Sequence, residues 1–422
     1  MGGRLAKQSG LLGLRHDPYA ALRYPNFRWF VASLLAMTLG TQTQAVVVGW
    51  QMYALTRDPL ALGLIGLAEA LPYIGLALFA GHVADAGNRR RISIVALVAL
   101  VACSAALLAF TVTPDVLTRH GVWPFYAVIF ASGVARSFLQ PARQALGAEL
   151  IPRELYVNAA AWRTSTWQTA AIAGPALGGL LYGFASAVTA YVVIVALLAA
   201  AAVTFAWIAY TPRALDGAPV TIAEGLRSGL RFVFSQPVLL GALTLDLFSV
   251  FLAGSEALLP VFASEILHVG PQGLGVLRAA PAAGAVVMSL YLAHRAPIER
   301  AGRVMLVAVA VFALCIIGFG LSRSFWLSLT LLAVSGMADN VSVVIRSTLL
   351  QLMTPPELLG RVSAVNAIFV GSSNELGAFE SGVAARLLGT VQAVVLGGIA
   401  SLGVVAVTAA RVPQLRRLRR IG

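Results

Sequence analysis

Twelve apolar segments, each long enough to cross a membrane, constrain this chain more than any other feature of its sequence. A transmembrane helix needs about 20 consecutive, mostly apolar residues. The segments cover 27–55, 61–81, 92–113, 122–146, 157–183, 186–210, 236–264, 271–293, 303–322, 325–352, 362–388 and 390–411. Barrel strands alternate over about ten residues, so these long unbroken runs exclude a β-barrel. The sequence predicts an all-α polytopic membrane protein with twelve transmembrane helices.

The amount and placement of charge support this class and orient the chain. Of its 422 residues, 59% are hydrophobic and only 11% are charged, whereas a soluble chain needs far more charge to cover its surface. The net charge of +13 is concentrated in the terminal segments and alternate loops, as at 89–91. Short loops rich in Lys and Arg stay in the cytoplasm. We therefore expect both termini to be cytoplasmic, and the positive charge to face membrane lipids rather than nucleic acid.

The stretches outside the apolar segments complete the predicted domain organisation. Residues 1–26 are expected to form a basic amphipathic segment on the inner leaflet. Residues 211–235 contain prolines, a glycine and several arginines, which indicates a cytoplasmic linker that can hold a short surface helix. The remaining predicted parts are an N-terminal bundle at 27–210, a C-terminal bundle at 236–412 and a basic cytoplasmic tail at 413–422.

The two predicted bundles repeat one another in sequence. A shift of 203 residues places 133–179 on 336–382 without a gap and aligns Arg143 with Arg346. A second block, which includes Pro72, repeats with a shift of 209 residues. Chance apolar similarity would match leucines, but it would not match prolines, glycines and charges in register. The repeat predicts two pseudo-symmetric six-helix bundles that rock about a shared cavity at the membrane midplane.

The repeat is broken at two charged positions inside the apolar segments. Arg136 aligns with Asp339, and Glu69 aligns with Arg278, so equivalent positions carry opposite charges. One interpretation is that these charges offset each other across the interface and only hold the bundles together. The other is that they line the cavity and change partners as it opens.

Four short stretches resemble one group within a large transporter superfamily. They are 19–28 (YAALRYPNFR), 55–59 (LTRDP), 141–144 (PARQ) and 152–154 (PRE). Over about residues 20–412 the chain resembles the major facilitator superfamily, and within it the enterobactin-exporter and macrolide-efflux type of proton-coupled antiporter. The resemblance implies a bacterial cytoplasmic membrane, a small-molecule substrate, protons as partners, no cofactor beyond the proton gradient, and commonly a monomer.

The loop between the second and third apolar segments carries a charged motif. Gly81, Asp85, Arg89 and Arg90 match the loop pattern of the superfamily, although an alanine at 86 replaces its usual arginine. The resemblance implies that Asp85 latches a cytoplasmic gate, with Arg143 as the best local partner. The alternative is a plain cytoplasmic turn held by topology alone.

The fifth apolar segment contains a glycine–proline motif formed by Gly174, Pro175, Gly178 and Gly179. It is similar to the motif of superfamily members that export by antiport, where it seals the outer half of the pathway. Proline removes a backbone hydrogen bond and bends the helix, and glycine lets a neighbouring helix approach closely. The alternative is a generic small-residue packing face.

Ionisable residues inside apolar segments are expensive and usually functional. The proton-coupling candidates are Asp246, Asp339, Glu375 and Arg136. A carboxylate whose surroundings alternate between apolar groups and an arginine can bind a proton on one side and release it on the other. Arg136 lies where the superfamily often places a functional arginine, but the usual Arg-x-x-Gln-Gly pattern is absent. Attraction of an anionic substrate is an equal interpretation for Arg136.

Other polar and aromatic residues suit a bulky amphipathic ligand, although each can equally be a packing residue. These further cavity candidates are Gln42, Gln44, Trp50, Glu69, Arg163, Trp167, Gln168, Glu256, Arg278, Asn340 and Glu380.

The leading functional hypothesis is a proton-coupled exporter of a small amphipathic molecule, siderophore-like in character. A multidrug or macrolide efflux pump and a lysophospholipid flippase remain alternatives. A membrane enzyme is disfavoured because the sequence has no Ser-His-Asp set, no phosphate loop and no metal-ligand cluster, and its five histidines lie near loops. A non-transporting scaffold or receptor predicts that the intramembrane charges are dispensable.

Overall fold

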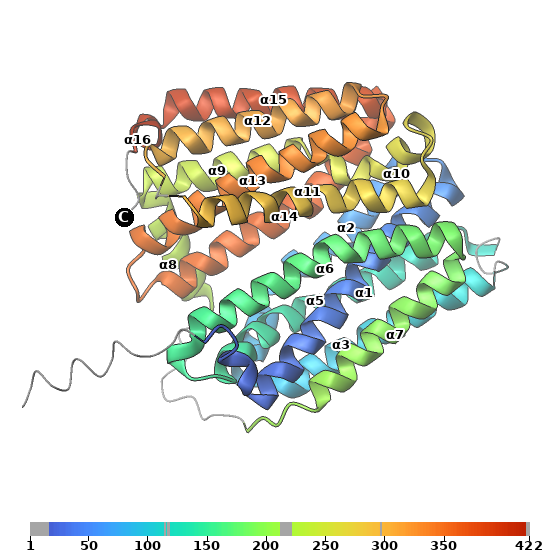
Figure 1. Cartoon of the computed structure of the whole chain (residues 1–422), viewed down its shortest axis with the longest axis horizontal. Helices are drawn as coiled ribbons and strands as arrows, with labels where there is room; N and C mark the ends of the chain where they lie inside the picture. Colours follow the sequence, from blue (N-terminus) through green and yellow to red (C-terminus); the bar gives the residue numbers. More distant parts are fainter. Residues whose placement is uncertain (1–16, 114, 116–118, 212–221, 296–297, 419–422) are drawn as a thin grey trace, which may run out of the picture.

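The structure is a computed structural model that describes residues 17–113, 115, 119–211, 222–295 and 298–418 (Figure 1). The side chains of residues 78, 85, 86 and 222–226 lie outside this description, as does most of the predicted N-terminal segment. Long helices make up most of the described chain, which confirms the all-α prediction.

The first half of the chain contains six long helices. They are α1 (Pro25–Thr56), α2 (Pro59–Ala86), α3 (Arg89–Val112), α5 (Trp123–Glu149), α6 (Tyr156–Phe184) and α7 (Ala187–Ala206). Short 3-10 turns precede α1 and α6, at Ala21–Arg23 and Arg153–Leu155. Two helix starts follow from local chemistry: Asp58 accepts a hydrogen bond from the backbone of Leu60 to cap α2, and Asn88 caps α3 in the same way.

The second half begins with α8 (Ile222–Ser235), which occupies the end of the predicted linker. The helices that follow are α9 (Pro237–Leu252), α10 (Leu259–Val261), α11 (Gly270–Ala293), α12 (Ala301–Leu321), α13 (Phe325–Met353), α14 (Leu359–Leu388), α15 (Thr390–Arg411) and α16 (Pro413–Arg417). The predicted segment 236–264 is a broken helix: α9 ends before Gly254, and the chain continues through a 3-10 turn, η4 (Ser255–Leu258), then α10 and a π-helical turn, η5 (Phe262–Ile266). The break places Glu256 in η4.

Nine helical stretches in the described part of the chain are long and apolar enough to cross a membrane. Three helices of similar length, α5, α6 and α14, are not among them. Each carries a charged side chain within its span: Arg136, Arg163 and Glu375, respectively. The chain is therefore a multi-pass membrane protein by length and composition, while the number of twelve crossings stays a prediction.

The packing of the helices repeats between the halves. In the first half, α1 packs on α6 and α7, α5 packs on α2 and α3, and α3 packs on α7. In the second half, α9 packs on α14 and α15, α13 packs on α11 and α12, and α12 packs on α15. These are the same five pairings under the sequence repeat, because α1 corresponds to α9, α2 to α11 and α5 to α13. The predicted pseudo-symmetry of the two bundles is thus confirmed by the fold.

Two long contacts join the halves, α2 with α14 and α6 with α11, and the pseudo-symmetry exchanges one for the other. Figure 1 shows the halves drawing together at one end and diverging at the other. We call the first the distal end, which holds the ends of α1 and α14. The second is the terminal end, which holds the start of α1 and α16.

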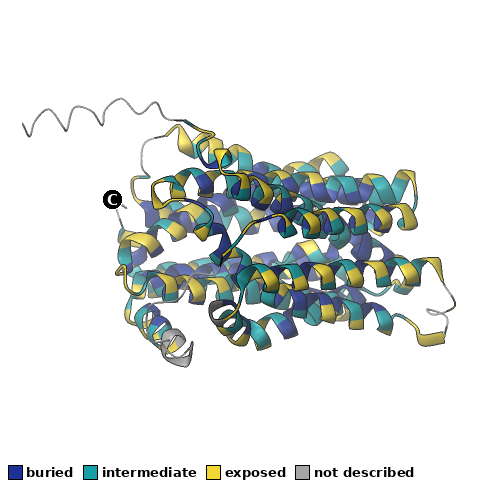
Figure 2. Ribbon diagram, turned by 90° about the horizontal axis from the view of Figure 1, so that it is seen from below, coloured by how far each residue is buried: buried dark blue, intermediate teal, exposed yellow. Residues whose placement is uncertain are grey.

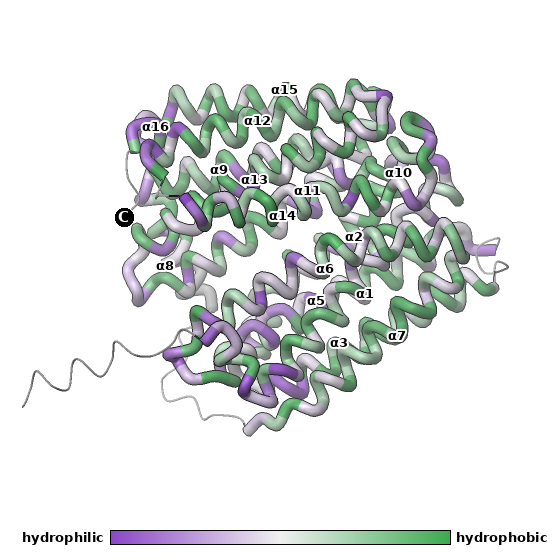
Figure 3. Tube along the Cα trace, viewed as in Figure 1, coloured by the Kyte–Doolittle hydropathy of each residue, from purple (hydrophilic) through white to green (hydrophobic). Residues whose placement is uncertain are grey.

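Apolar side chains cover the outside of both halves. Large exposed examples include Phe79, Val98, Phe184, Leu290 and Val407. Figure 2 shows buried residues along the inner helix faces and exposed residues outside, and Figure 3 shows hydrophilic positions gathered toward the helix ends. An apolar outer surface with polar ends is what a helical bundle surrounded by lipid requires.

Candidate functional site

An ion pair joins two helices of the first half beside the contact between the halves. Arg136 on α5 and Glu69 on α2 are 2.7 Å apart. Their helices approach closely because α5 has Gly133 here, where a Cβ atom would lie 2.7 Å from Pro72. The Arg136 side chain keeps 44% of its surface accessible. It therefore lines accessible space instead of being sealed between helices.

The second half adds a carboxyl group to this pair. Glu375 lies on α14, which packs tightly against α2: a Cβ atom on Gly66 of α2 would be 2.9 Å from the backbone oxygen of Glu375. Glu375 lies within electrostatic range of Glu69, Arg136, Arg278 and Glu256. It therefore faces charges from both halves.

Asp339 on α13 extends the group, since it lies within electrostatic range of Glu256. We call the resulting set the interface cluster; it consists of Glu69, Arg136, Glu256, Arg278, Asp339 and Glu375. The cluster contains four carboxyl groups and two guanidinium groups, so it holds an excess of acid. All six residues are predicted site residues, and the fold places each of them within electrostatic range of at least one other member.

Asp246 does not belong to this cluster. It forms an ion pair with Arg346, between α9 and α13, and both side chains are buried. The pair has a counterpart in the first half, where the 203-residue shift aligns Arg143 with Arg346 and the 209-residue shift aligns Met37 with Asp246. There Arg143 donates to the Met37 sulfur at 3.6 Å and to Gln140 Oε1 at 2.7 Å. Both halves thus have an arginine at this equivalent position. Among the described residues, only the arginine of the second half is paired with an acid.

The glycine–proline motif lies at a junction of three helices. Gly174 and Gly178 face α1, where Thr43 donates a 3.0 Å hydrogen bond to the Gly174 carbonyl. Gly179 faces α11 of the other half, and a Cβ atom there would lie 2.5 Å from the Pro271 carbonyl oxygen and 2.9 Å from the Cα of Gly275. The motif therefore allows backbone-to-backbone contact between the halves on the distal side.

Polar contacts join the halves at the distal end. Asp58, at the start of α2, forms a 2.7 Å ion pair with Arg386 near the end of α14. Tyr53 donates a 2.5 Å hydrogen bond to Glu265, and Arg57 donates to Ser264 at 3.2 Å. We call these contacts the distal clasp. These contacts were not predicted from the sequence, although Asp58 lies in one of the four stretches that carried the resemblance.

At the terminal end, two arginines of α3 contact other helices of the first half. Arg89 forms an ion pair with Glu149 at the end of α5, and Arg90 donates to the backbone carbonyl of Ala206. Gly81 has open space around it. The side chain of Asp85 lies outside the described residues, so the predicted latch between Asp85 and Arg143 stays a prediction.

Several cavity candidates are engaged in packing. Gln44 accepts a 2.5 Å hydrogen bond from Ser104, Asn340 accepts one of 3.1 Å from Ser289, and the Trp50 ring packs edge-on against Tyr182. The Cβ of Gln42 lies against Gly174.

The remaining candidates lie on α6 and α14. Trp167 is 49% exposed, while Gln168 Oε1 is buried and has no hydrogen-bond partner in the described part of the chain. Arg163 and Glu380 are half-buried. Within the described residues, no group of three or more His, Cys, Asp or Glu side chains could hold a metal ion.

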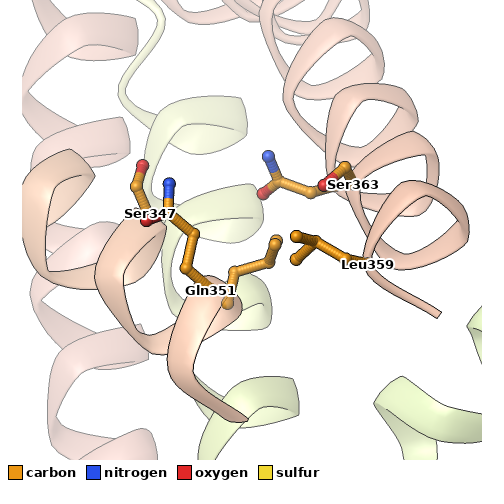
Figure 4. Close-up of a pocket in the computed structure, with 6 residues that line it drawn as sticks. Ser347, Gln351, Leu359 and Ser363 are labelled. Carbon is orange, nitrogen blue, oxygen red and sulfur yellow. The ribbon is translucent and has the colours of Figure 1, made fainter. Parts of the chain in front are cut away.

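A cavity of about 370 Å³ lies between α13 and α14 near the terminal end (Figure 4). Its lining residues are Ser347, Leu350, Gln351, Leu359, Ser363 and Asn366. The Asn366 Oδ1 atom is buried and lacks a hydrogen-bond partner among the described residues. The pocket could not be predicted from the sequence because its lining residues are uncharged.

The chain is similar to known membrane transporters over most of its length. The family described as transmembrane secretion effector (MFS_3) matches residues 16–420. The chain is 27% identical to the enterobactin exporter EntS of Citrobacter koseri over 354 residues, which is 81% of each protein. It is also 27% identical to the MFS-type transporter YhjO of Bacillus subtilis over 310 residues, which is 74% of each.

Solved structures show the same fold at much lower identity. A POT family transporter in complex with 5-aminolevulinic acid superposes with a TM-score of 0.72 at 10% identity, over 92% of this chain and 96% of that one. A bacterial homologue of the lysosomal transporter Spinster, in an inward-facing and unoccupied conformation, gives 0.67 at 14% identity over 93% and 97% of the two chains. Together with the family match, these findings show that the chain belongs to the MFS_3 family of major facilitator transporters.

Proposed function

We propose that this protein is a proton-coupled exporter of a small amphipathic, siderophore-like molecule in the bacterial cytoplasmic membrane. Residues 27–210 and 236–412 act as its two moving bundles, and both termini are cytoplasmic. The chain works as a monomer, and the proton gradient is its only energy source. The observation that carries the proposal is the interface cluster, in which four carboxyl groups and two arginines from both halves each lie within electrostatic range of another member.

The composition of the cluster supports proton coupling. With every group ionised, the cluster holds two more negative than positive charges, and the repulsion among carboxylates grows as the surrounding dielectric constant falls. Protonation of one carboxyl group relieves this repulsion. Glu375 is the best-placed group for that role, because it faces the Glu69–Arg136 pair across the contact between the halves.

The coupling follows from the location of Glu375 on the moving interface. When Glu375 is protonated, Arg136 remains paired with Glu69 within the first half. When Glu375 is ionised, it competes with Glu69 for Arg136 and draws the halves together. Protonation thereby changes the relative energy of the two arrangements, which is what coupling a proton to alternating access requires.

The arrangement of the halves supports an inward-facing state. The distal clasp and the Gly179–Gly275 contact close the distal end. With cytoplasmic termini, the terminal end at which the halves diverge faces the cytoplasm. An exporter takes up its substrate in this state.

The test is substrate uptake into proteoliposomes that have an acidic lumen, with enterobactin, erythromycin and a labelled lysophospholipid as the panel. We expect the gradient to stimulate enterobactin uptake in the wild type and in Glu357→Gln, which alters an exposed acid before α14. Glu375→Gln should lose the stimulation but retain exchange of labelled for unlabelled substrate.

Equal uptake with and without a gradient would contradict proton coupling. Gradient-stimulated movement of erythromycin or lysophospholipid instead of enterobactin would replace the substrate class and favour the multidrug pump or the flippase. Full gradient stimulation in Glu375→Gln would remove Glu375 from the mechanism.

A further inference from the structure

We propose that Arg143 and Arg163 form a binding site for an anionic oxygen group, so that the exported molecule is a small amphipathic anion. This inference rests on the proposed export function and adds the charge of the substrate to it. It depends on two arginines of the first half that have no acidic partner among the described residues.

The first observation is a local excess of positive charge. Arg143 on α5 lies within electrostatic range of Arg136 and of Arg163 on α6. Arg136 is paired with Glu69, whereas the hydrogen bonds of Arg143 go to a neutral amide and a thioether. In the described part of the chain, neither Arg143 nor Arg163 forms a salt bridge. Guanidinium groups gathered in a partly buried place are unfavourable unless an anion offsets them.

The second observation comes from the repeat, which supplies an internal control. Arg346, the counterpart of Arg143, is neutralised by Asp246. Arg143 meets Met37 at the position equivalent to Asp246. The same fold therefore shows how such an arginine is stabilised when its role is structural: an acid is built in beside it. The first half leaves out that acid.

The third observation concerns Arg163 and its surroundings. The 203-residue shift aligns Arg163 with Asn366, which lines the neutral polar pocket between α13 and α14 (Figure 4). Trp167 follows Arg163 by four residues, hence on the same face of α6, and is 49% exposed. The first half thus places a cation and an exposed aromatic ring on one face of α6, where the equivalent position of the second half lines an uncharged pocket.

These groups define the ligand chemistry. A guanidinium group binds carboxylate, phosphate and similar oxyanions through paired hydrogen bonds, and it keeps its charge at any physiological pH. An aromatic side chain nearby favours a ligand with an aromatic or apolar body. The predicted substrate therefore combines an anionic oxygen group with such a body.

The test is a binding measurement with a matched probe pair on the full chain in phosphatidylcholine nanodiscs. The probes are dansylglycine, which carries a carboxylate, and dansylglycinamide, in which that group is a neutral amide. Probe fluorescence is titrated against protein, and empty nanodiscs supply the background. We expect the wild type to bind dansylglycine at least about tenfold more tightly than dansylglycinamide. This ratio corresponds to one hydrogen bond to a charged group.

The variants locate the effect. The double variant Arg143→Gln with Arg163→Gln should bind the two probes with about equal affinity. The double variant Arg143→Lys with Arg163→Lys should keep part of the preference for dansylglycine, because the charge is kept. Arg411→Gln, at the exposed end of α15, should bind like the wild type. The comparison of probes on the wild type does not depend on whether any variant folds.

Equal binding of the two probes by the wild type, or binding of neither, would overturn the proposal. An unchanged preference in the double Gln variant would do the same. Loss of dansylglycine binding when phosphatidylglycerol is added to the nanodiscs would assign the site to a lipid headgroup and also overturn it. Anion-selective binding without gradient-driven uptake in proteoliposomes would instead contradict the proposed function and leave this inference standing.

Discussion

Alanine at Gly179 is expected to open the distal end of the molecule. The new Cβ atom would lie 2.5 Å from the Pro271 carbonyl oxygen of the other half. A normal C···O contact is about 3.3 Å, so the backbones must separate by about 0.8 Å. Because the contacting atoms are backbone, no side-chain rotation can relieve the clash. Overpacking of this kind costs about 1–3 kcal/mol, which disfavours the closed distal end by roughly 5- to 150-fold.

The substitution acts on the arrangement of the halves more than on folding. Alanine is favoured over glycine within a helix by about 1 kcal/mol, so α6 itself is not weakened. Gly75→Ala is the matched control, because Gly75 is also inside a long helix and has nothing within 4 Å of its Cβ position. It should leave the arrangement of the halves unchanged.

The assay is a distance measurement by pulsed electron paramagnetic resonance. Spin labels are placed on cysteines at the exposed distal positions Leu55 and Leu388, in a background where Cys103 and Cys315 are replaced by alanine. The Gly179→Ala variant should lose most of the short-distance population that the wild type and Gly75→Ala show. An unchanged distribution in Gly179→Ala would refute the assignment of this contact to the closed distal end.

Three further outcomes are expected. Asp246→Ala should lower the free energy of unfolding by about 3–5 kcal/mol, because it leaves Arg346 buried without its partner. The double variant Asp246→Met with Arg346→Leu should recover much of this stability in a thermal unfolding assay. Asp58→Asn keeps the cap of α2 but removes the ion pair with Arg386. The same distance measurement should therefore show a small shift toward an open distal end, worth about 0.2–1 kcal/mol. A larger shift would contradict the weak, solvent-exposed character of the pair. Gly66→Ala should shift the distances in the same direction as Gly179→Ala, because its Cβ would lie 2.7 Å from the Cβ of Ala378; no shift would contradict a closed α2–α14 contact.

Much of the architecture could be predicted because the sequence repeat indicates which helices occupy equivalent positions in the two halves. Two pseudo-symmetric halves must pair their helices in equivalent ways, and the fold shows those pairings. Charged residues inside apolar segments were likewise informative. A charge in lipid is costly, so Glu69, Arg136 and Glu375 had to face protein or water, and they meet at the contact between the halves.

Partner choice was harder to predict, because apolar patterning does not say which helix a buried charge faces. Asp246 appeared to be as good a proton carrier as Asp339, but its pairing with Arg346 depends on how α9 lies against α13. The distal clasp joins Asp58 to Arg386, 328 positions away in the sequence, and it depends on the docking of the halves. The break after α9 lies at Gly254, inside one predicted segment, 236–264, whose hydrophobicity does not mark where a helix ends.

The central claim is that a carboxyl group of the interface cluster carries the transported proton. Its most direct test is the pH of the lumen, reported by trapped pyranine in acid-loaded proteoliposomes after enterobactin is added outside. The wild type should release protons from the lumen as substrate enters, while Glu375→Gln should exchange substrate with no change in luminal pH. Substrate-driven proton release that is equal in Glu375→Gln and the wild type would contradict this account.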